Sequence, residues 1–196
     1  MDFYNLSSAN KLRRSMLNLE HSESLNSRIK MQDATAFSRV GFRGQGVERF
    51  LAEQGLPVPS APNQSVLSDT GLVILRLSMT EFWILDTDNA QHELIAALEF
   101  ASKGLSQVYR LYCQHSHAFF LITGKEISSM FAKICGVDLS EGAFSVASIA
   151  QTSVARTNAI VVRQEKNGEE AFLLLSDLAS SQYLWDAIVD AAAEFA

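Results

Sequence analysis

Hydrophobic and polar residues follow regular patterns from residue 36 onward. Val40 and Phe42 alternate with polar neighbours, as expected for a strand, and the pattern then breaks at Gly44. A short helix ending at Gly55 is predicted next, followed by strands at 71–77 and 82–85. Residues 90–101 have helical periodicity, with Leu94, Ala97, Leu98 and Ala101 on one stripe. The first half therefore reads strand–helix–strands–helix.

The second half repeats this order. A strand at 118–122 ends at Gly124, and a helix with Ile127, Met130, Phe131 and Ile134 on one face ends at Gly136. Strands at 159–163 and 171–175 flank Asn167-Gly168, a strong signal for a hairpin turn. The last helix is expected to bury Leu184, Ile188, Ala191 and Phe195.

The sequences of the two halves can be aligned with each other. Gly44 matches Gly124, Gly55 matches Gly136, Phe82 matches Phe172, Leu94 matches Leu184 and Leu98 matches Ile188. One such unit would leave one face of its sheet bare, so two are expected to pack together around a shared core. We predict an α+β, pseudo-twofold domain at residues 36–196, with halves at about 36–104 and 105–196. Residues 1–35 are expected to form an N-terminal extension with a short helix near 12–19.

Composition and charge narrow the class of protein. The chain has 196 residues and a net charge of −6, and 47% of its residues are hydrophobic, as in ordinary globular domains. No clustered basic face and no long apolar run is evident, so neither a nucleic acid nor a membrane is an expected partner. Residues 1–50 carry eight Lys/Arg and five Asp/Glu, which suits either an acidic partner surface or a solvated tail. Two cysteines in this context suggest a reducing compartment, so the cytoplasm is expected.

The loop from Gly41 to Gly46 lies between a predicted strand and helix, where phosphate-binding loops occur. Its spacing matches neither common nucleotide fingerprint, so a structural turn is the favoured interpretation. Cys113, His115 and His117 alternate, but a tetrahedral metal site needs a fourth ligand that no neighbouring Cys or His supplies. We therefore expect no metal.

Asp86 and Asp88 follow a predicted strand. The two carboxylates would suit acid–base chemistry, but helix capping is the favoured role. No nucleophile–base pairing or dinucleotide motif stands out, so we expect no catalytic residue and no cofactor held by this chain.

Several short motifs carry a family resemblance between residues 37 and 196. They are Arg39-Val-Gly-Phe-Arg-Gly44, Gly55-Leu-Pro57 with Pro62-Asn63, Leu75-Arg76-Leu77, Glu81-Phe-Trp-Ile-Leu85, Cys135-Gly-Val-Asp138-Leu139, Ala150-Gln-Thr152 with Ala155-Arg156, and Phe172-Leu-Leu-Leu175 with the C-terminal helix. Their order and spacing resemble the gamma subunit of heterotetrameric sarcosine oxidase, which has the folate-binding fold of the glycine-cleavage T protein.

The resemblance implies a role in oxidising sarcosine to glycine, with transfer of the one-carbon unit to tetrahydrofolate. It implies alpha, beta and delta partners that carry FAD, FMN, NAD and tetrahydrofolate, and a gamma subunit that is not catalytic. A related oxidase of another N-methyl amine is equally compatible. The alternative is a free-standing folate-binding or aminomethyltransferase-like protein.

Four residues are candidates for partner contact. Arg39 and Arg43 alternate with apolar residues on the first strand, and are expected to form an exposed pair able to grip a carboxylate. Tyr183 and Trp185 lie beside the apolar stripe of the last helix, where aromatics often anchor interfaces. The alternative is that Trp185 belongs to the core and that the arginines are solvated.

Overall fold

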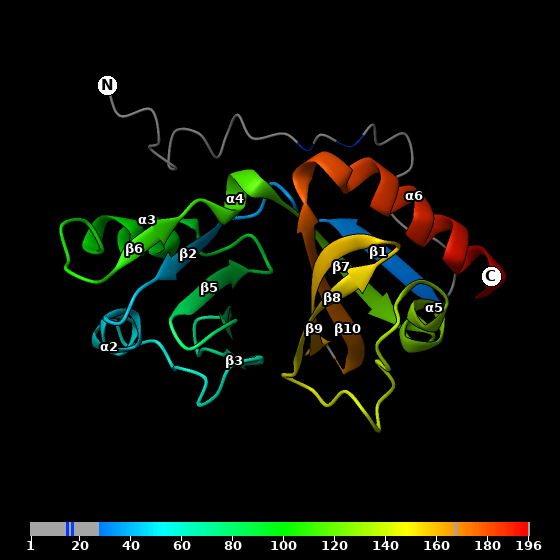
Figure 1. The fold of residues 1–196 in the computed structure, drawn as a ribbon, viewed down its shortest axis with the longest axis horizontal. Coiled ribbons are helices and arrows are strands. Elements are labelled where there is room, and N and C mark those ends of the chain that lie inside the picture. Colours follow the sequence, from blue (N-terminus) through cyan, green and yellow to red (C-terminus); the bar gives the residue numbers. More distant parts are fainter. Residues whose placement is uncertain (1–14, 16, 18–27, 167, 196) are drawn as a thin grey trace. The chain divides into compact units, whose positions relative to one another are not determined.

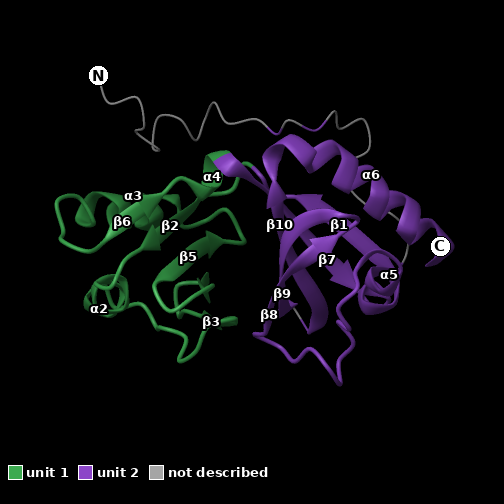
Figure 2. Cartoon of the chain, viewed as in Figure 1, with its two compact units in different colours: residues 1–14, 36–115 green, residues 15–35, 116–196 purple. Residues whose placement is uncertain are grey.

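The computed structural model describes residues 15, 17, 28–166 and 168–195, and the expected helix near 12–19 lies outside this part except for Ser15 and Leu17. The fold is mixed α+β with two antiparallel sheets (Figure 1). The described part of the chain divides into two compact units (Figure 2). Unit 1 comprises residues 36–115, and unit 2 comprises the described residues of 15–35 and of 116–195.

Unit 1 is built on a five-stranded sheet with the order β3-β4-β5-β2-β6. Its strands are β2 (Arg39–Arg43), β3 (Gln64–Leu67), β4 (Leu72–Arg76), β5 (Glu81–Asp86) and β6 (Tyr109–Leu111), and its helices are α2 (Val47–Glu53) and α3 (His92–Ala101). Val40 and Phe42 of β2 pack with apolar residues of both helices in one core, in which Phe42 meets Phe50 edge to face at 5.3 Å. The predicted stripe of α3 is shifted, because Ile95 and Leu98 are the fully buried apolar residues.

Unit 2 has a second five-stranded sheet, with the order β1-β7-β10-β9-β8. Its strands are β1 (Ile29–Asp33), β7 (His117–Gly124), β8 (Ile149–Val154), β9 (Thr157–Lys166) and β10 (Glu169–Asp177). Its helices are α5 (Ile127–Ile134) and α6 (Ser181–Ala192), with 3-10 turns η1 (Leu178–Ser180) and η2 (Ala193–Phe195). The predicted β9–β10 hairpin is confirmed, with Gly168 at φ 77° in its turn. The short helix α4 (Cys113–Ser116) spans the residues at which the chain passes from unit 1 to unit 2.

One of the two edge strands of each sheet comes from a distant part of the chain. β1 precedes β2 in sequence, yet it pairs with β7, where Met31 lies opposite Ile122. β6 precedes β7, yet it pairs with β2. Residues 29–33, expected to belong to an extension, are thus a sheet strand, and the first sheet extends beyond residue 104 to β6.

A glycine directly after β2 and another at the end of β7 permit a close backbone approach. Gly44 has φ 139° and Gly124 has φ 136°. An added Cβ would lie 2.0 Å from the carbonyl oxygen of Gln107 at the first position and 1.9 Å from that of Arg28 at the second. Both carbonyls shortly precede the edge strand of the sheet concerned, so a larger residue would push that strand away.

A buried arginine on β4 holds the loop between α2 and β3. Arg76 is 5% exposed and lies opposite Phe82, with its guanidinium 5.1 Å from the ring centre. Its Nη1 donates to the carbonyl of Pro59 at 2.9 Å, and its Nη2 meets Glu48 at 3.0 Å. The planar guanidinium satisfies several acceptors at once and so fixes a loop that contains all three prolines.

Arg163 on β9 holds the corresponding loop of unit 2. It is 6% exposed and lies opposite Phe172 in the ladder. Its Nη1 donates to the carbonyl of Phe144 at 2.9 Å, and its Nη2 pairs with Glu170 at 2.9 Å. Because the charge is buried, loss of one partner would leave the other uncompensated.

The assignment of β1 to the sheet can be tested by substitution. Ile29 and Met31 are buried at 0% and 2% exposure, whereas Lys30 and Gln32 are exposed. We expect Ile29→Ala to lower the free energy of unfolding by about 2–5 kcal/mol, because it leaves a cavity in the core.

Lys30→Ala is the matched control and is expected to change the free energy of unfolding by no more than about 0.5 kcal/mol. Urea unfolding of both variants provides the measurement. Equal, small effects would mean that this segment does not pack as a strand.

Candidate functional site

The loop between β2 and α2 uses its backbone N–H groups within the fold. Gly44 donates to the carbonyl of Thr80 at 2.9 Å, and Gly46 donates to that of Gln107 at 3.0 Å. Val47 donates to the carbonyl of Gly44 at 3.3 Å. These donors are not directed at a ligand, so the interpretation of the loop as a structural turn is supported.

The Cys113–His117 segment does not form the alternating strand that a shared face requires. Cys113 and His115 lie in the single turn α4, and His117 begins β7. The ring of His115 stacks on Tyr112 at 6.4 Å, and Nδ1 of His117 hydrogen-bonds with the hydroxyl of Ser116 at 2.8 Å. Within the described ranges, no group of three or more His, Cys, Asp or Glu residues is arranged to hold a metal ion.

Asp86 holds the turn that leads into α3, whereas the N-cap position of that helix is occupied by Gln91 and not by an aspartate. The carboxylate of Asp86 accepts hydrogen bonds from the backbone N–H groups of Ala90 at 3.1 Å and Gln91 at 2.7 Å. These are N–H groups at the entry to α3 that lack partners within the helix. Asp88 is exposed, and its own N–H donates to Asp86 at 3.3 Å. The two carboxylates therefore do not form a paired acid–base site.

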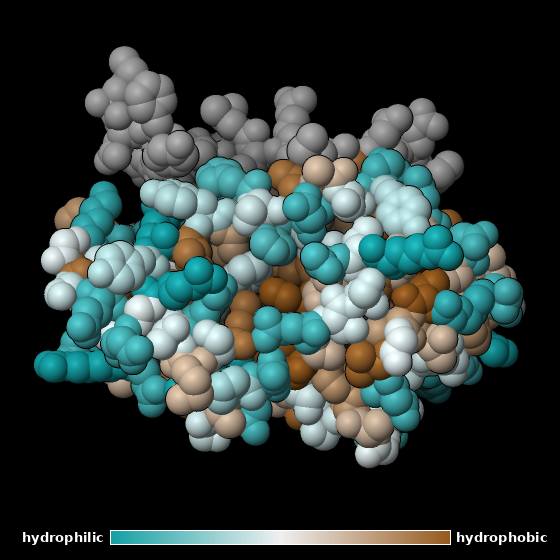
Figure 3. All heavy atoms as spheres, in the orientation of Figure 1, coloured by the Kyte–Doolittle hydropathy of each residue, from teal (hydrophilic) through white to brown (hydrophobic). Residues whose placement is uncertain are grey.

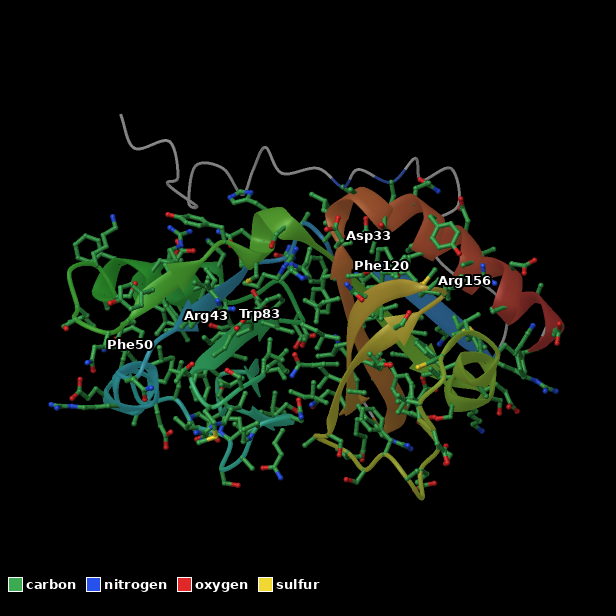
Figure 4. The ribbon with its side chains drawn as sticks, in the orientation of Figure 1. Asp33, Arg43, Phe50, Trp83, Phe120 and Arg156 are labelled. Carbon is green, nitrogen blue, oxygen red and sulfur yellow. The ribbon has the colours of Figure 1, made fainter. Side chains whose placement is uncertain are left out.

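The prediction that both arginines of β2 are exposed is wrong for Arg39. Its exposure is 0%, and Nη1 donates to the carbonyl of Phe37 at 3.2 Å. Alternation along a strand tells which residues share a face, but not whether that face is covered. Arg43 is exposed, and its Nε donates to Glu81 at 3.0 Å; Glu81 also accepts from the indole of Trp83 (Figure 4).

On α6, Trp185 is a core residue. It is 5% exposed and meets Phe120 of β7 edge to face at 5.3 Å. It joins the predicted stripe because Leu184, Trp185 and Ile188 lie within one broad apolar face. Tyr183 is 54% exposed and remains available at the surface.

Tyr183 lines a pocket of about 490 Å³ in unit 2. The pocket lies between the end of α5, the β8–β9 turn and α6, and its lining residues are Lys133, Ile134, Cys135, Gly136, Ala155, Arg156, Tyr183, Ala187 and Asp190. Figure 4 shows Arg156 beside α6. Small side chains leave the hollow open: a Cβ added at Gly136 would meet nothing within 4 Å. Sequence reasoning placed Arg156 in a motif but assigned it no role.

The turn that carries Arg156 has an unusual conformation. Val154 lies opposite Thr157, so Ala155 and Arg156 form a two-residue hairpin loop. Their φ angles are 47° and 67°, a combination that favours Asn-Gly in most hairpins. The left-handed region costs an ordinary residue about 1–2 kcal/mol, so the surrounding contacts must hold the turn.

A second pocket in unit 2, of about 500 Å³, is lined by polar groups that include His117 and Asp177. These residues lie opposite each other on β7 and β10. Asp177 accepts the backbone N–H of Ala179 at 2.7 Å and so caps η1. This bond and the Ser116 bond of His117 give both side chains local structural partners.

Two surface groups have shifted pKa values. The hydroxyl and the backbone N–H of Ser140 bond to the carboxylate of Asp138 and lower its pKa, and the hydrogen bond and ion pair with Glu53 raise the pKa of Arg49. Neither Asp138 nor Arg49 lines the pocket at Arg156 or the pocket at His117. On the face drawn in Figure 3, hydrophilic and hydrophobic residues are intermixed.

No family model matches the chain, and no curated protein sequence is significantly similar. Among solved structures, the chain is similar to a chain of heterotetrameric sarcosine oxidase from Corynebacterium sp. U-96, with a TM-score of 0.75 and 21% identity over 94% of this chain and 96% of that chain. It is also similar to glycine cleavage system aminomethyltransferase T from Bartonella henselae, with a TM-score of 0.62 and 18% identity over 85% of this chain and 46% of that chain. The resemblance expected from the sequence is confirmed at the level of the fold. None of the helices in the described part is long and apolar enough to cross a membrane.

The core position of Trp185 leads to a stability prediction. Trp185→Ala is expected to lower the free energy of unfolding by about 3–5 kcal/mol, because a large ring is removed from beside Phe120. Tyr183→Ala, two residues away on the exposed side, is expected to change it by no more than about 0.5 kcal/mol.

Guanidinium unfolding of the isolated chain provides the measurement. A Trp185→Ala variant as stable as the Tyr183→Ala control would show that the ring is not part of the core.

Proposed function

We propose that this chain is a non-catalytic, gamma-type subunit of a heterotetrameric sarcosine oxidase, or of a related oxidase of another N-methyl amine. The observation that carries the proposal is the extent of the structural match. The chain spans 96% of the sarcosine oxidase chain but only 46% of the aminomethyltransferase chain. A match over nearly the whole sarcosine oxidase chain favours the subunit over an aminomethyltransferase, of which less than half is matched.

The roles of the polar residues support a non-catalytic subunit. Asp86 accepts backbone N–H groups of the turn that leads into α3, and the N–H groups of the Gly44–Gly46 loop bond to carbonyls of the fold. The groups that first suggested acid–base chemistry or phosphate binding are thus used in structure. In this proposal the alpha, beta and delta partners hold FAD, FMN, NAD and tetrahydrofolate, and the assembly is cytoplasmic.

We further infer that the two units are copies of one ancestral unit, related by a pseudo-twofold repeat. Reading the first sheet as β3-β4-β5-β2-β6 and the second in reverse as β8-β9-β10-β7-β1 pairs equivalent strands in the same order. Gly44 and Gly124 share an unusual φ, and Arg76 and Arg163 each lie opposite a phenylalanine. These correspondences favour the glycine-cleavage T-protein type of architecture, with 36–104 and 105–196 as the approximate halves.

Folate binding by the chain alone is the second candidate function. The similarity to aminomethyltransferase T favours it, since that enzyme shares the fold over 85% of this chain. A shared fold does not by itself establish a function. Calorimetric titration of the isolated chain with tetrahydrofolate separates the two candidates, and micromolar affinity would favour the folate binder.

The subunit proposal predicts a stable complex. When the chain is tagged and co-expressed with the larger oxidase subunits of the same organism, we expect those subunits to co-purify in a fixed ratio with sarcosine oxidase activity. The tagged chain expressed alone is expected to lack this activity. Recovery of the chain without partners, from cells in which the other subunits assemble, would contradict the proposal.

A further inference from the structure

The strained hairpin turn is held in place by contacts with α5. The N–H of Ala155 donates to the carbonyl of Ile134 at 2.7 Å, and the backbone of Cys135 forms an isolated antiparallel β-bridge with that of Val154. The hydroxyl of Thr157 also closes the turn, by donating to the carbonyl of Val154 at 2.8 Å. The turn lines a pocket and keeps a left-handed conformation although it contains no glycine. This combination indicates a functional role for the side chain of Arg156.

The pocket offers one unused positive charge. Lys133 is engaged, because its Nζ pairs with Glu194 at 2.7 Å and donates to the carbonyl of Ala191 at 3.1 Å. Arg156 is exposed, and its guanidinium has no hydrogen bond or ion pair with any residue that the structure describes. Its five donors form a planar fork that matches a carboxylate.

The wall opposite the turn suits a polypeptide ligand. Tyr183, Ala187 and Asp190 follow helical spacing on the side of α6 away from the core. An exposed Tyr beside an Arg is a combination typical of interface anchors, since both give large contact area with specific polar bonds. The small residues Gly136 and Ala187 leave space for an inserted side chain.

We infer that this pocket is a docking site for a partner polypeptide, in which Arg156 binds the carboxylate of an inserted Asp or Glu and Tyr183 covers the side chain. This inference deepens the proposed function, because the partner it fits is a subunit of the same assembly. Asp190 restricts the partner to a single carboxylate at this place, since a second one would meet a like charge.

A small probe tests the recognition chemistry without any partner. N-acetyl-glutamate amide presents the side-chain carboxylate, and N-acetyl-glutamine amide is its uncharged match. In ¹⁵N-resolved NMR titrations of the isolated chain with the glutamate probe, we expect saturable chemical-shift changes at Ala155, at Arg156 including its Nε, and at Gly136. The dissociation constant is expected to be on the order of 1 mM. Equal shifts with both probes, or shifts elsewhere only, would overturn the inference.

Substitutions separate recognition from folding. Arg156→Gly relieves the backbone and is expected to raise the Tm while weakening binding of the glutamate probe about tenfold, because the charged hydrogen bonds are lost. Ala155→Gly is the matched control and should raise the Tm with binding unchanged. Asp190→Asn should strengthen binding a few-fold by removing a like charge. An Arg156→Gly variant that binds as well as the wild type would refute the assignment.

The same variants decide whether the partner uses this pocket. Arg156→Gln, and Gly136→Leu, which fills the pocket, are expected to weaken co-purification with the larger oxidase subunits at least about tenfold. Arg49→Gln, on α2 in unit 1, should leave it unchanged. If the wild type assembles and the pocket variants assemble equally well, the inference fails and the proposed function stands. If the wild type does not assemble, the proposed function fails and the probe titration alone decides the inference.

Discussion

The pairing of each sheet with an edge strand from a distant part of the chain is the constraint on which both units depend. β1 completes the sheet of β7, and β6 completes the sheet of β2. Backbone donors and acceptors on these strands find partners only through this pairing. The strands approach closely because Gly44 and Gly124 have no side chain at the contact. Residues 29–33 are thus a component of the sheet of unit 2.

Buried arginines complement this arrangement by holding the long loops. Arg76 and Arg163 each lie opposite a phenylalanine and donate to a loop carbonyl, so a charged side chain is buried with its acceptors in place. A loop carbonyl satisfied by an internal guanidinium needs no regular secondary structure around it. The two buried arginines therefore let irregular loops pack closely on the sheets.

The division between structure and recognition follows from these roles. Residues that the sequence offered as candidates for chemistry, such as Asp86 and the Gly44–Gly46 loop, form hydrogen bonds that hold turns of the fold. Arg156 is different, because its strained turn is held by contacts of the backbone while its side chain remains outside them. Similarity to a sarcosine oxidase chain and to an aminomethyltransferase establishes the fold, and a fold does not by itself establish the function of this chain.

The sequence alone determined the elements with strong local signals: the strand ending at Gly124, the amphipathic helices and the β9–β10 hairpin. Hydrophobic periodicity and turn preferences depend on neighbouring residues, so these features could be predicted from the sequence. Tertiary structure decided the partner of β1, the burial of Arg39 and Trp185, and the pocket at Arg156. Each depends on residues far apart in the chain, and alternation does not reveal whether a second face of a sheet is covered or which strand completes its edge.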